Sequence, residues 1–189
     1  MRTSQTGIDL IRSFEGCCLK AYRLQGETYY TIGYGHYGAD VKAGMTVTYA
    51  QAEELLRSDL KKFEGYAAQY APSGLNQNQF DALVSFCYNC GPGSLKQLCT
   101  GRTIAQIPEH IESYTSSASE SYRAGLLRRR QAEHKLYNTP VKQEGKPVTV
   151  TDAKKILADK AGLSAATIVY LDSYKYGDEL ILKLAKAMQ

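Results

Sequence analysis

The hydrophobic pattern that opens the chain is helical and ends at a glutamate. Ile8, Ile11 and Phe14 recur at the spacing of one helix face. Glu15 follows them directly, and Gly16 is the kind of residue at which helices commonly stop. The pattern therefore predicts a helix that ends at Glu15.

The second pattern is aromatic and β-branched, and it predicts strands. Residues 17–36 have the composition of a β-hairpin, with a turn at 24–27 and a strand at 28–32. Residues 41–47 are expected to form a short third strand. Together these segments predict a small β lobe after the first helix.

Beyond the β lobe the pattern becomes helical again. Thr48 and Gln51 form a capping box at the start of a long helix, which Pro72 ends. Asn76 caps the next helix, whose apolar stripe is too wide for a surface helix, so we predict that it is buried. It is expected to stop at Gly91, and a shorter helical piece follows. Two more helices are predicted, at 104–114 and 126–137.

A polar stretch bracketed by prolines, at 140–148, has the composition of a linker. We therefore expect two domains, at 1–139 and 149–189, with three short helices in the second. About forty residues rarely supply a stable core on their own. The second domain is therefore expected to dock on the first, to form a homo-oligomer through its helices, or to be packed unusually tightly.

Composition and charge narrow the function classes only a little. The chain has 189 residues and a net charge of +4, which suits an anionic partner such as a bacterial cell wall without proving one. No apolar run approaches membrane-spanning length, and residues 1–5 lead into the first helix without a signal peptide. We expect neither stable membrane insertion nor ordinary secretion.

The chain has five cysteines, an odd number, which favours reduced thiols over a disulfide framework. A zinc site made of Cys17, Cys18, Cys87 and Cys90 is conceivable. Cys87 and Cys90 lie in an apolar helical pattern, however, where small buried residues are expected. We therefore expect no metal and no organic cofactor.

Glu15 is the first candidate catalytic residue. The helix dipole is negative where the helix ends, which disfavours the charged carboxylate, and partial burial would raise its pKa further. A carboxylic acid that is protonated near neutral pH can donate a proton to a glycosidic oxygen. The alternative is an ordinary solvated glutamate at a helix end, and the local sequence leaves it open.

Five separated motifs occur in the same order as in a known family. They are residues 14–16 (FEG), 19–22 (LKAY), 30–36 (YTIGYGH), 76–91 (NQNQFDALVSFCYNCG) and 128–133 (RRRQAE). Over roughly residues 5–140 the chain resembles the phage-type lysozymes, the endolysins of glycoside hydrolase family 24. The resemblance implies an α+β lysozyme-like fold with a hairpin lobe and a helical lobe facing across a cleft. It also implies cleavage of the bond between N-acetylmuramic acid and N-acetylglucosamine in peptidoglycan.

The resemblance also assigns roles to individual positions. Glu15 corresponds to the family's general acid, and Thr31 to a threonine that helps to place the attacking water. Asn89 falls where some members have a cleft-lining amide, and Tyr34 is a candidate substrate contact. His36 matches a family position as well, but we expect it to anchor the end of the strand by a hydrogen bond.

One departure from the family concerns the second carboxylate. The family usually has an aspartate nine residues after the acid, and Leu24 occupies that position here. Glu27 is the nearest carboxylate. If the strand already runs from residue 27, Glu27, Tyr29 and Thr31 share one face, and Glu27 is a candidate for the missing role. The turn could instead leave Glu27 in solvent.

Four functions therefore remain open. The first is an inverting muramidase. The second is a lytic transglycosylase, which needs one glutamate and which the missing aspartate favours. The third is a wall-binding protein without catalysis, although such a protein would have little reason to retain both Glu15 and Thr31. Nucleic-acid binding through the arginines at 128–130 is the weakest alternative, because a short basic run is usually a solvated face or a set of salt-bridge donors.

The second domain is expected to bind the cell wall and so to raise the local enzyme concentration on an insoluble substrate. A purely stabilising or dimerising role is the alternative. Because no signal peptide is seen, we expect accumulation in the host bacterial cytoplasm and release through a separate membrane lesion.

Overall fold

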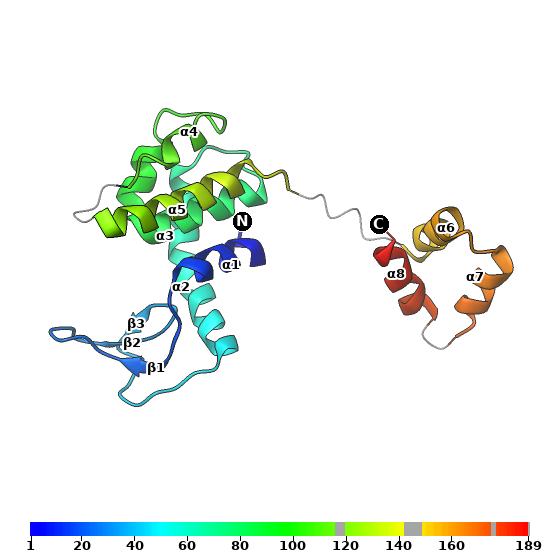
Figure 1. Cartoon of the computed structure of the whole chain (residues 1–189), viewed down its shortest axis with the longest axis horizontal. Coiled ribbons are helices and arrows are strands. Elements are labelled where there is room, and N and C mark those ends of the chain that lie inside the picture. The colour runs from blue at the N-terminus through cyan, green and yellow to red at the C-terminus, as the bar shows by residue number, and fades with distance from the viewer. Residues whose placement is uncertain (116–119, 142–148, 175–176, 189) are drawn as a thin grey trace. The chain divides into compact units, whose positions relative to one another are not determined.

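The computed structural model describes residues 1–115, 120–141, 149–174 and 177–188. The chain forms two compact units, Met1–Val141 and Lys142–Gln189 (Figure 1). From residue 142 on, the predicted linker at 140–148 lies outside the described residues.

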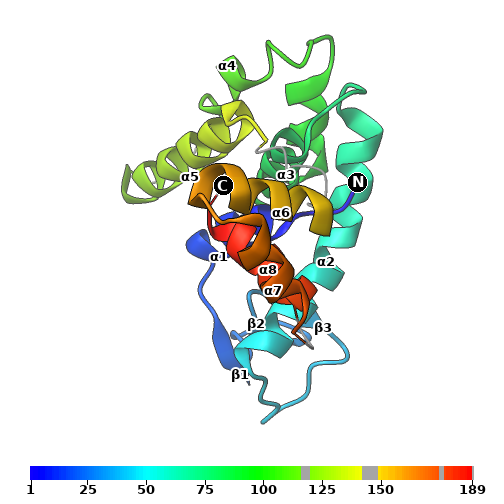
Figure 2. The same ribbon diagram turned by 90° about the vertical axis from the view of Figure 1, so that its right-hand side faces the viewer.

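The helical part of the first unit is built around one buried helix. Its helices are α1 (Gln5–Phe14), α2 (Tyr49–Tyr70), α3 (Gln77–Cys99), α4 (Pro108–Ile111) and α5 (Glu120–Asn138). Helix α3 packs against α1, α2 and α5, and Figure 2 shows it between α2 and α5. Its residues 80–87 are all buried, which confirms the prediction of a core helix.

The capping residues act as the pattern predicted. Thr48 and Gln51 form the capping box of α2, and Asn76 and Gln79 form that of α3. Gly91 interrupts α3 with a φ of 82°, a left-handed conformation that favours glycine, and a shorter helical piece follows. The chain therefore turns where the sequence indicates.

The β lobe is a three-stranded antiparallel sheet in the order β1 (Cys18–Tyr22), β2 (Tyr30–Gly33) and β3 (His36–Gly38). The prediction of a third strand at 41–47 was wrong. Gly35, with a φ of 94°, lets the chain reverse directly after β2, so His36 pairs with Ile32. Of residues 41–47, Thr46 alone pairs, in an isolated bridge to Lys20.

Three element boundaries also differ from the expectation, and one of them is the start of the helix predicted at 126–137, which is α5 and begins at Glu120. The helix predicted at 104–114 is reduced to α4, because proline is tolerated in the first turn of a helix but not in its interior, and α4 begins at Pro108. The strand predicted at 28–32 begins only at Tyr30.

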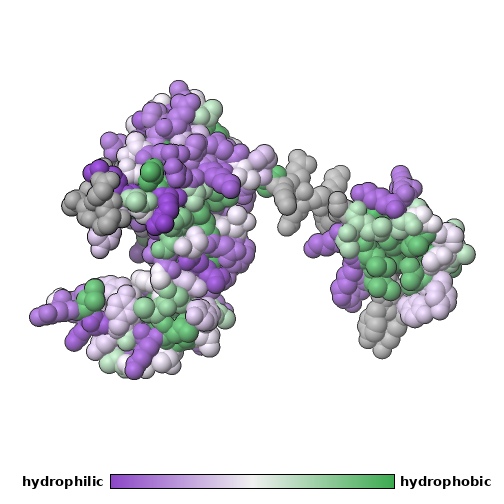
Figure 3. All heavy atoms as spheres, in the orientation of Figure 1, coloured by the Kyte–Doolittle hydropathy of each residue, from purple (hydrophilic) through white to green (hydrophobic). Residues whose placement is uncertain are grey.

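The described residues of the second unit form three helices, as its periodicity predicted. They are α6 (Val150–Ala161), α7 (Ala165–Asp172) and α8 (Gly177–Ala187). Its buried core is small and contains Ala153, Leu157, Ile181 and Ala185. Helix α7 has no buried residue, and Figure 3 shows apolar residues gathered on one face of the unit.

No helix in the described parts of the chain is long and apolar enough to cross a membrane.

Candidate active site

Glu15 lies at the end of α1, as predicted. It is the C-cap residue, with φ −98° and ψ 135°, and its N–H donates to the carbonyl of Ile11 at 3.1 Å. Its side chain is 27% exposed. The carboxylate is therefore partly buried but reachable from solvent.

The carboxylate of Glu15 is held by an arginine from α5. Nη1 of Arg129 donates to Oε1 of Glu15 at 2.6 Å, a charge-assisted hydrogen bond, and the Arg129 side chain is only 5% exposed. The guanidinium also lies over the rings of Phe14 and Tyr88. The end of α1 repels the negative charge of Glu15, whereas the buried guanidinium of Arg129 attracts it.

Arg129 is in turn fixed by a buried acidic residue on its own helix. Oε1 of Glu133 accepts from Nε of Arg129 at 3.3 Å and from the hydroxyl of Ser85 at 2.8 Å. Arg130 contacts Glu133 as well, at 2.7 Å between Nε and Oε2. Burial raises the pKa of Glu133, although Arg130, Ser85 and Arg129 act in the opposite direction. Because the network is buried, removing one member leaves another charge without compensation.

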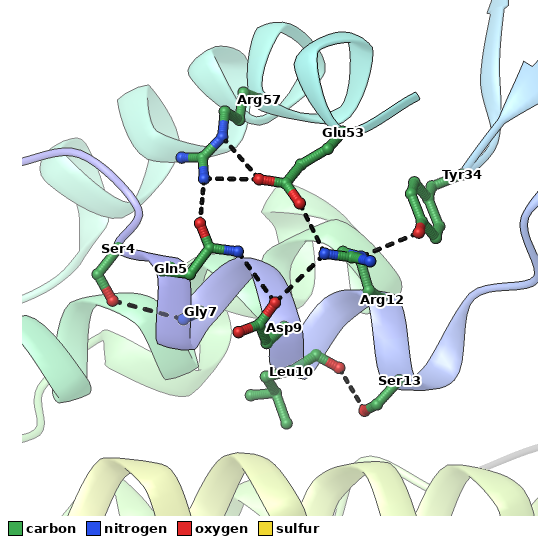
Figure 4. A network of polar contacts seen from close by, with 10 residues as sticks. All are labelled: Ser4, Gln5, Gly7, Asp9, Leu10, Arg12, Ser13, Tyr34, Glu53 and Arg57. Carbon is green, nitrogen blue, oxygen red and sulfur yellow. Dashed lines mark hydrogen bonds and ion pairs between the residues drawn. The ribbon is translucent and has the colours of Figure 1, made fainter. Parts of the chain in front are cut away.

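A second polar network anchors α1 to α2 and to the β lobe (Figure 4). Arg12 donates from Nε to the Tyr34 hydroxyl at 2.9 Å and forms an ion pair with Glu53 at 2.6 Å. Asp9, Gln5 and Arg57 complete the network. These contacts fix the helix whose end carries Glu15.

Tyr88 connects the core helix to the β lobe. Its hydroxyl donates to the carbonyl of Tyr34 at 2.8 Å. Burial raises the pKa of Tyr88 to about 12, so the hydroxyl stays protonated and remains a donor. The position of the chain just after β2 is therefore tied to the ring that also contacts Arg129.

A cavity of about 630 Å³ opens beside Glu15. Its lining residues come from the end of α1, from α3 and from the first half of α5: Ser13, Phe14, Glu15, Asn89, Tyr122, Gly125, Leu126, Arg128 and Arg129. Among the described residues that line it, Glu15 is the only carboxylate. The cavity has the size of a site that could hold a small ligand or part of a chain.

The structure brings some predicted residues together and separates others. Asn89 is exposed and lines the cavity with Glu15. Thr31 lies in the central strand β2, is 8% exposed and does not line the cavity. Tyr34 is 6% exposed, and its hydroxyl is engaged by Arg12, which disfavours direct contact of its ring with a substrate.

Glu27 closes a turn of the hairpin. Its Oε2 accepts from the N–H of Leu24 at 3.0 Å, and its own N–H donates to the carbonyl of Leu24. Because β2 begins at Tyr30, the strand alternation that would place Glu27 on the face of Thr31 does not extend to residue 27. That premise of the prediction was wrong, and Glu27 does not line the cavity beside Glu15.

His36 anchors the end of the sheet, as predicted. Nδ1 lies 2.9 Å from an oxygen of Asp59 on α2, and Nε2 lies 2.8 Å from Asp40. Burial disfavours the charged imidazolium, but the hydrogen bonds to Asp40 and Asp59 outweigh it and raise the pKa of His36.

The cysteines do not form a cluster that could bind a metal ion. Among the residues that the structure describes, no group of three or more His, Cys, Asp or Glu side chains is arranged to hold one. Burial raises the pKa of Cys87 to about 12, whereas Cys18 is exposed. Cys87 is therefore a protonated core residue.

Sequence reasoning missed the partner of Glu15. It grouped the arginines at 128–130 as a basic run without distinguishing their directions. The one available signal was the spacing of Arg129 and Arg130 from Glu133, four and three residues, which places them beside it on a helix. No comparable signal connects Arg129 to Glu15, because the two are 114 residues apart.

Comparison with known proteins shows the family of this chain. The model of the family described as "Phage lysozyme" matches residues 12–133. An endolysin of Bacillus phage PZA is 39% identical over 193 residues, which cover 98% of this chain and 68% of the relative. An endolysin of Bacillus phage B103 is 41% identical over 145 residues, which cover 74% of this chain and 55% of the relative. The chain thus spans about two thirds of the first relative and about half of the second.

A solved structure is similar over the first unit. The muramidase domain of SpmX from Asticaccaulis excentricus has 35% sequence identity and a TM-score of 0.64, covering 74% of this chain and 99% of that domain. The fold is therefore the predicted α+β lysozyme-like one, with a small antiparallel sheet and added C-terminal helices. The chain belongs to the phage lysozyme family of lysozyme-type glycoside hydrolases.

Proposed function

We propose that the first unit hydrolyses the glycosidic bond between N-acetylmuramic acid and N-acetylglucosamine in bacterial peptidoglycan. The observation that carries the proposal is Glu15, a partly exposed carboxyl group at the side of a cavity of about 630 Å³ and fixed by Arg129. A positioned carboxylic acid is what protonation of a leaving glycosidic oxygen requires. The endolysin and muramidase relatives support the same activity.

The two oxygens of Glu15 are suited to different tasks. Oε1 accepts the bond from Arg129, and among the described residues Oε2 has no hydrogen-bond partner. Oε2 is therefore the atom from which the proton passes to the glycosidic oxygen. Arg129 keeps the carboxyl group in one orientation while this occurs, and orientation of this kind contributes strongly to catalysis.

The attack on the sugar is assigned to water from the side of the β lobe. Thr31 would place this water, as the family resemblance implies, and Glu27 would act as its base or as an electrostatic stabiliser. Inversion requires the two carboxyl groups to be about 6.5–9.5 Å apart, so that a water fits between them. Asn89 would contact the substrate beside Glu15.

A lytic transglycosylase remains the second candidate. The observation that favours it is that Glu15 is the only carboxylate among the described residues lining its cavity. In that chemistry Glu15 acts first as acid and then as base, and a hydroxyl of the sugar replaces water as the nucleophile.

Mass analysis of digested peptidoglycan distinguishes the functions. Hydrolysis adds one water and leaves reducing ends, whereas transglycosylation leaves anhydro ends without that water. We expect reducing ends. Anhydro ends would establish the transglycosylase, and undigested glycan would establish a protein without catalysis.

We further propose that the second unit binds the cell wall. Its large exposed apolar residues supply contact surface, and those in and beside α7 are Val169, Tyr170 and Tyr174. The match to the PZA endolysin, which covers 98% of this chain, includes most of this unit. The protein would accumulate in the host cytoplasm and reach the wall after a membrane lesion.

Truncation after Val141 tests this second proposal. If the unit binds walls, the truncated chain should cleave soluble fragments normally, sediment less with intact walls and lyse cells more slowly. If it only stabilises or dimerises, the truncation should lower the melting temperature or the oligomeric state and slow cleavage of every substrate alike. Equal wall binding by both chains would refute the targeting role.

A further inference from the structure

The three consecutive arginines on α5 have different environments. Arg129 and Arg130 are buried and bonded to Glu15 or Glu133. Arg128 is exposed, and in the part of the chain that the structure describes it has no hydrogen-bond or ion-pair partner. Neighbouring residues on a helix point about 100° apart, so one basic run supplies both an internal network and a separate surface cation.

Arg128 nevertheless belongs to the site. It lines the cavity that contains Glu15, on the same helix as Tyr122 and Gly125. Asn89 lines the cavity from α3. The site therefore contains one cation that holds the candidate acid, Arg129, and one that is available for a ligand, Arg128.

We propose that Arg128 binds a carboxylate of the peptide stem of the substrate, and so makes the enzyme selective for glycan that carries stems. The inference rests on the proposed function, because peptidoglycan combines a glycan chain with peptides that end in carboxylates. A guanidinium presents paired N–H donors that match a carboxylate. The stem is attached to N-acetylmuramic acid, which is one of the two sugars joined by the bond to be cleaved.

The surroundings of Arg128 suit this ligand better than a nucleic acid. Binding along a phosphate backbone uses several exposed cations in a row. Here the other two arginines of the run are buried and paired, which leaves Arg128 as the member of the run that can meet a ligand.

The test compares two soluble, uncrosslinked wall fragments that differ only in their stem carboxylates, which are free in one and converted to methylamides in the other. Arg128→Gln should lower kcat/KM on the free carboxylate about fivefold, a size that an exposed ion pair supports, and chiefly through KM. On the methylamide, kcat/KM of Arg128→Gln should stay within about twofold of wild type, because this fragment has no carboxylate charge for Arg128 to pair with.

Lys135→Gln is the matched control. Lys135 is exposed on the same helix and does not line the cavity. Its replacement by Gln removes one positive charge, as Arg128→Gln does. Lys135 lies seven residues after Arg128, which is about two helical turns, so both lie near the same face of α5. Lys135→Gln should change kcat/KM on both fragments equally. If it lowers the preference for the free carboxylate as much as Arg128→Gln does, the preference comes from long-range attraction and the inference is wrong.

Binding of the same fragments, measured by calorimetry on wild type and Arg128→Gln, separates this inference from the proposed function. If wild type cleaves neither fragment but binds the free carboxylate more tightly, and Arg128→Gln removes the preference, the hydrolase assignment fails and the inference stands. If Arg128→Gln weakens the binding of both fragments alike, or of neither, the inference is wrong even when the enzyme is active.

Discussion

Glu15 and Glu27 lie in two regions of the first unit that fix a side chain in different ways. Glu15 belongs to the helical wall, which we define as Phe14, Glu15, Asn89 and Arg129, and its bond to Arg129 joins residues 114 apart in the sequence. Glu27 belongs to the hairpin, residues 18–38, and its bond joins it to Leu24, three residues away. One carboxylate is held by the tertiary fold, and the other by its own turn.

The difference shows what a fold adds to a motif. A bond within a turn keeps a carboxylate near the backbone of that turn, whatever the rest of the protein does. A bond to a buried arginine instead fixes the carboxylate relative to the cavity, because Glu133 holds that arginine from the core and is itself bonded to Ser85. The helical wall therefore fixes its carboxylate relative to the cavity, whereas the hairpin fixes Glu27 only relative to its own turn.

The largest effect is expected for Glu15→Gln. The amide has nearly the same shape but cannot donate the required proton, so turnover should fall by about 10²–10⁴-fold. The melting temperature and the circular dichroism spectrum should remain those of wild type. Wild-type turnover in a correctly folded Glu15→Gln protein would refute the assignment of the acid.

The next largest effect is expected for Arg129→Gln. Loss of the guanidinium frees the Glu15 carboxyl group to rotate, and misplacement by about 1 Å can cost about 10²-fold in rate. Arg129→Lys should recover part of the activity, because it retains the charge but not both bonds. Turnover of soluble wall fragments checks this, with the melting temperature as control for the buried Glu133. Wild-type kcat in both variants would show that the bond to Glu15 has no catalytic role.

Glu27→Gln tests the hairpin half of the comparison. The amide oxygen can still accept from the N–H of Leu24, so the turn and the melting temperature should be preserved while the negative charge is lost. If Glu27 is the second carboxylate, turnover falls about tenfold, equivalent to about 1.4 kcal/mol of transition-state stabilisation. Activity within about twofold of wild type would leave Glu15 as the one carboxylate needed and would favour the transglycosylase.

The smallest effect on activity is expected at His36, which affects stability. Its pKa is raised above 6.5, so the folded state binds a proton more tightly than the unfolded chain does. The contribution to the free energy of unfolding is therefore complete below about pH 6.5 and is lost as the pH rises through the raised pKa. Urea unfolding of wild type and His36→Asn over a pH series should show this loss in wild type only. Parallel pH profiles would contradict the ion pairs with Asp40 and Asp59.

The sequence predicted well where the helices that carry the helical wall begin or end. Apolar spacing placed the end of α1 at Glu15, and a capping residue placed the start of α3 at Asn76. These features depend on neighbours within one helical turn, which a sequence displays directly. The motifs that carried the family resemblance also predicted the fold class correctly.

The features that the sequence did not predict depend on the direction in which a side chain points and on contacts between segments far apart in the sequence. Whether Arg128 or Arg129 meets Glu15 depends on how α5 packs against α1 and α3, which periodicity leaves open when three identical residues are adjacent. The premise about Glu27 failed because its side chain bonds to Leu24 and β2 starts at Tyr30. A capping bond within a turn competes with strand formation, and composition does not reveal which prevails.

The central claim is that Arg129 acts through Glu15, and a double-variant cycle tests it most directly. Turnover of soluble wall fragments is measured for wild type, Glu15→Gln, Arg129→Gln and the double variant, all with matched melting curves. If Arg129 only positions the acid, it has nothing to position once Glu15 is an amide, so the double variant should match Glu15→Gln within about twofold. A double variant that is slower than Glu15→Gln by the full factor that Arg129→Gln causes in wild type would contradict the account.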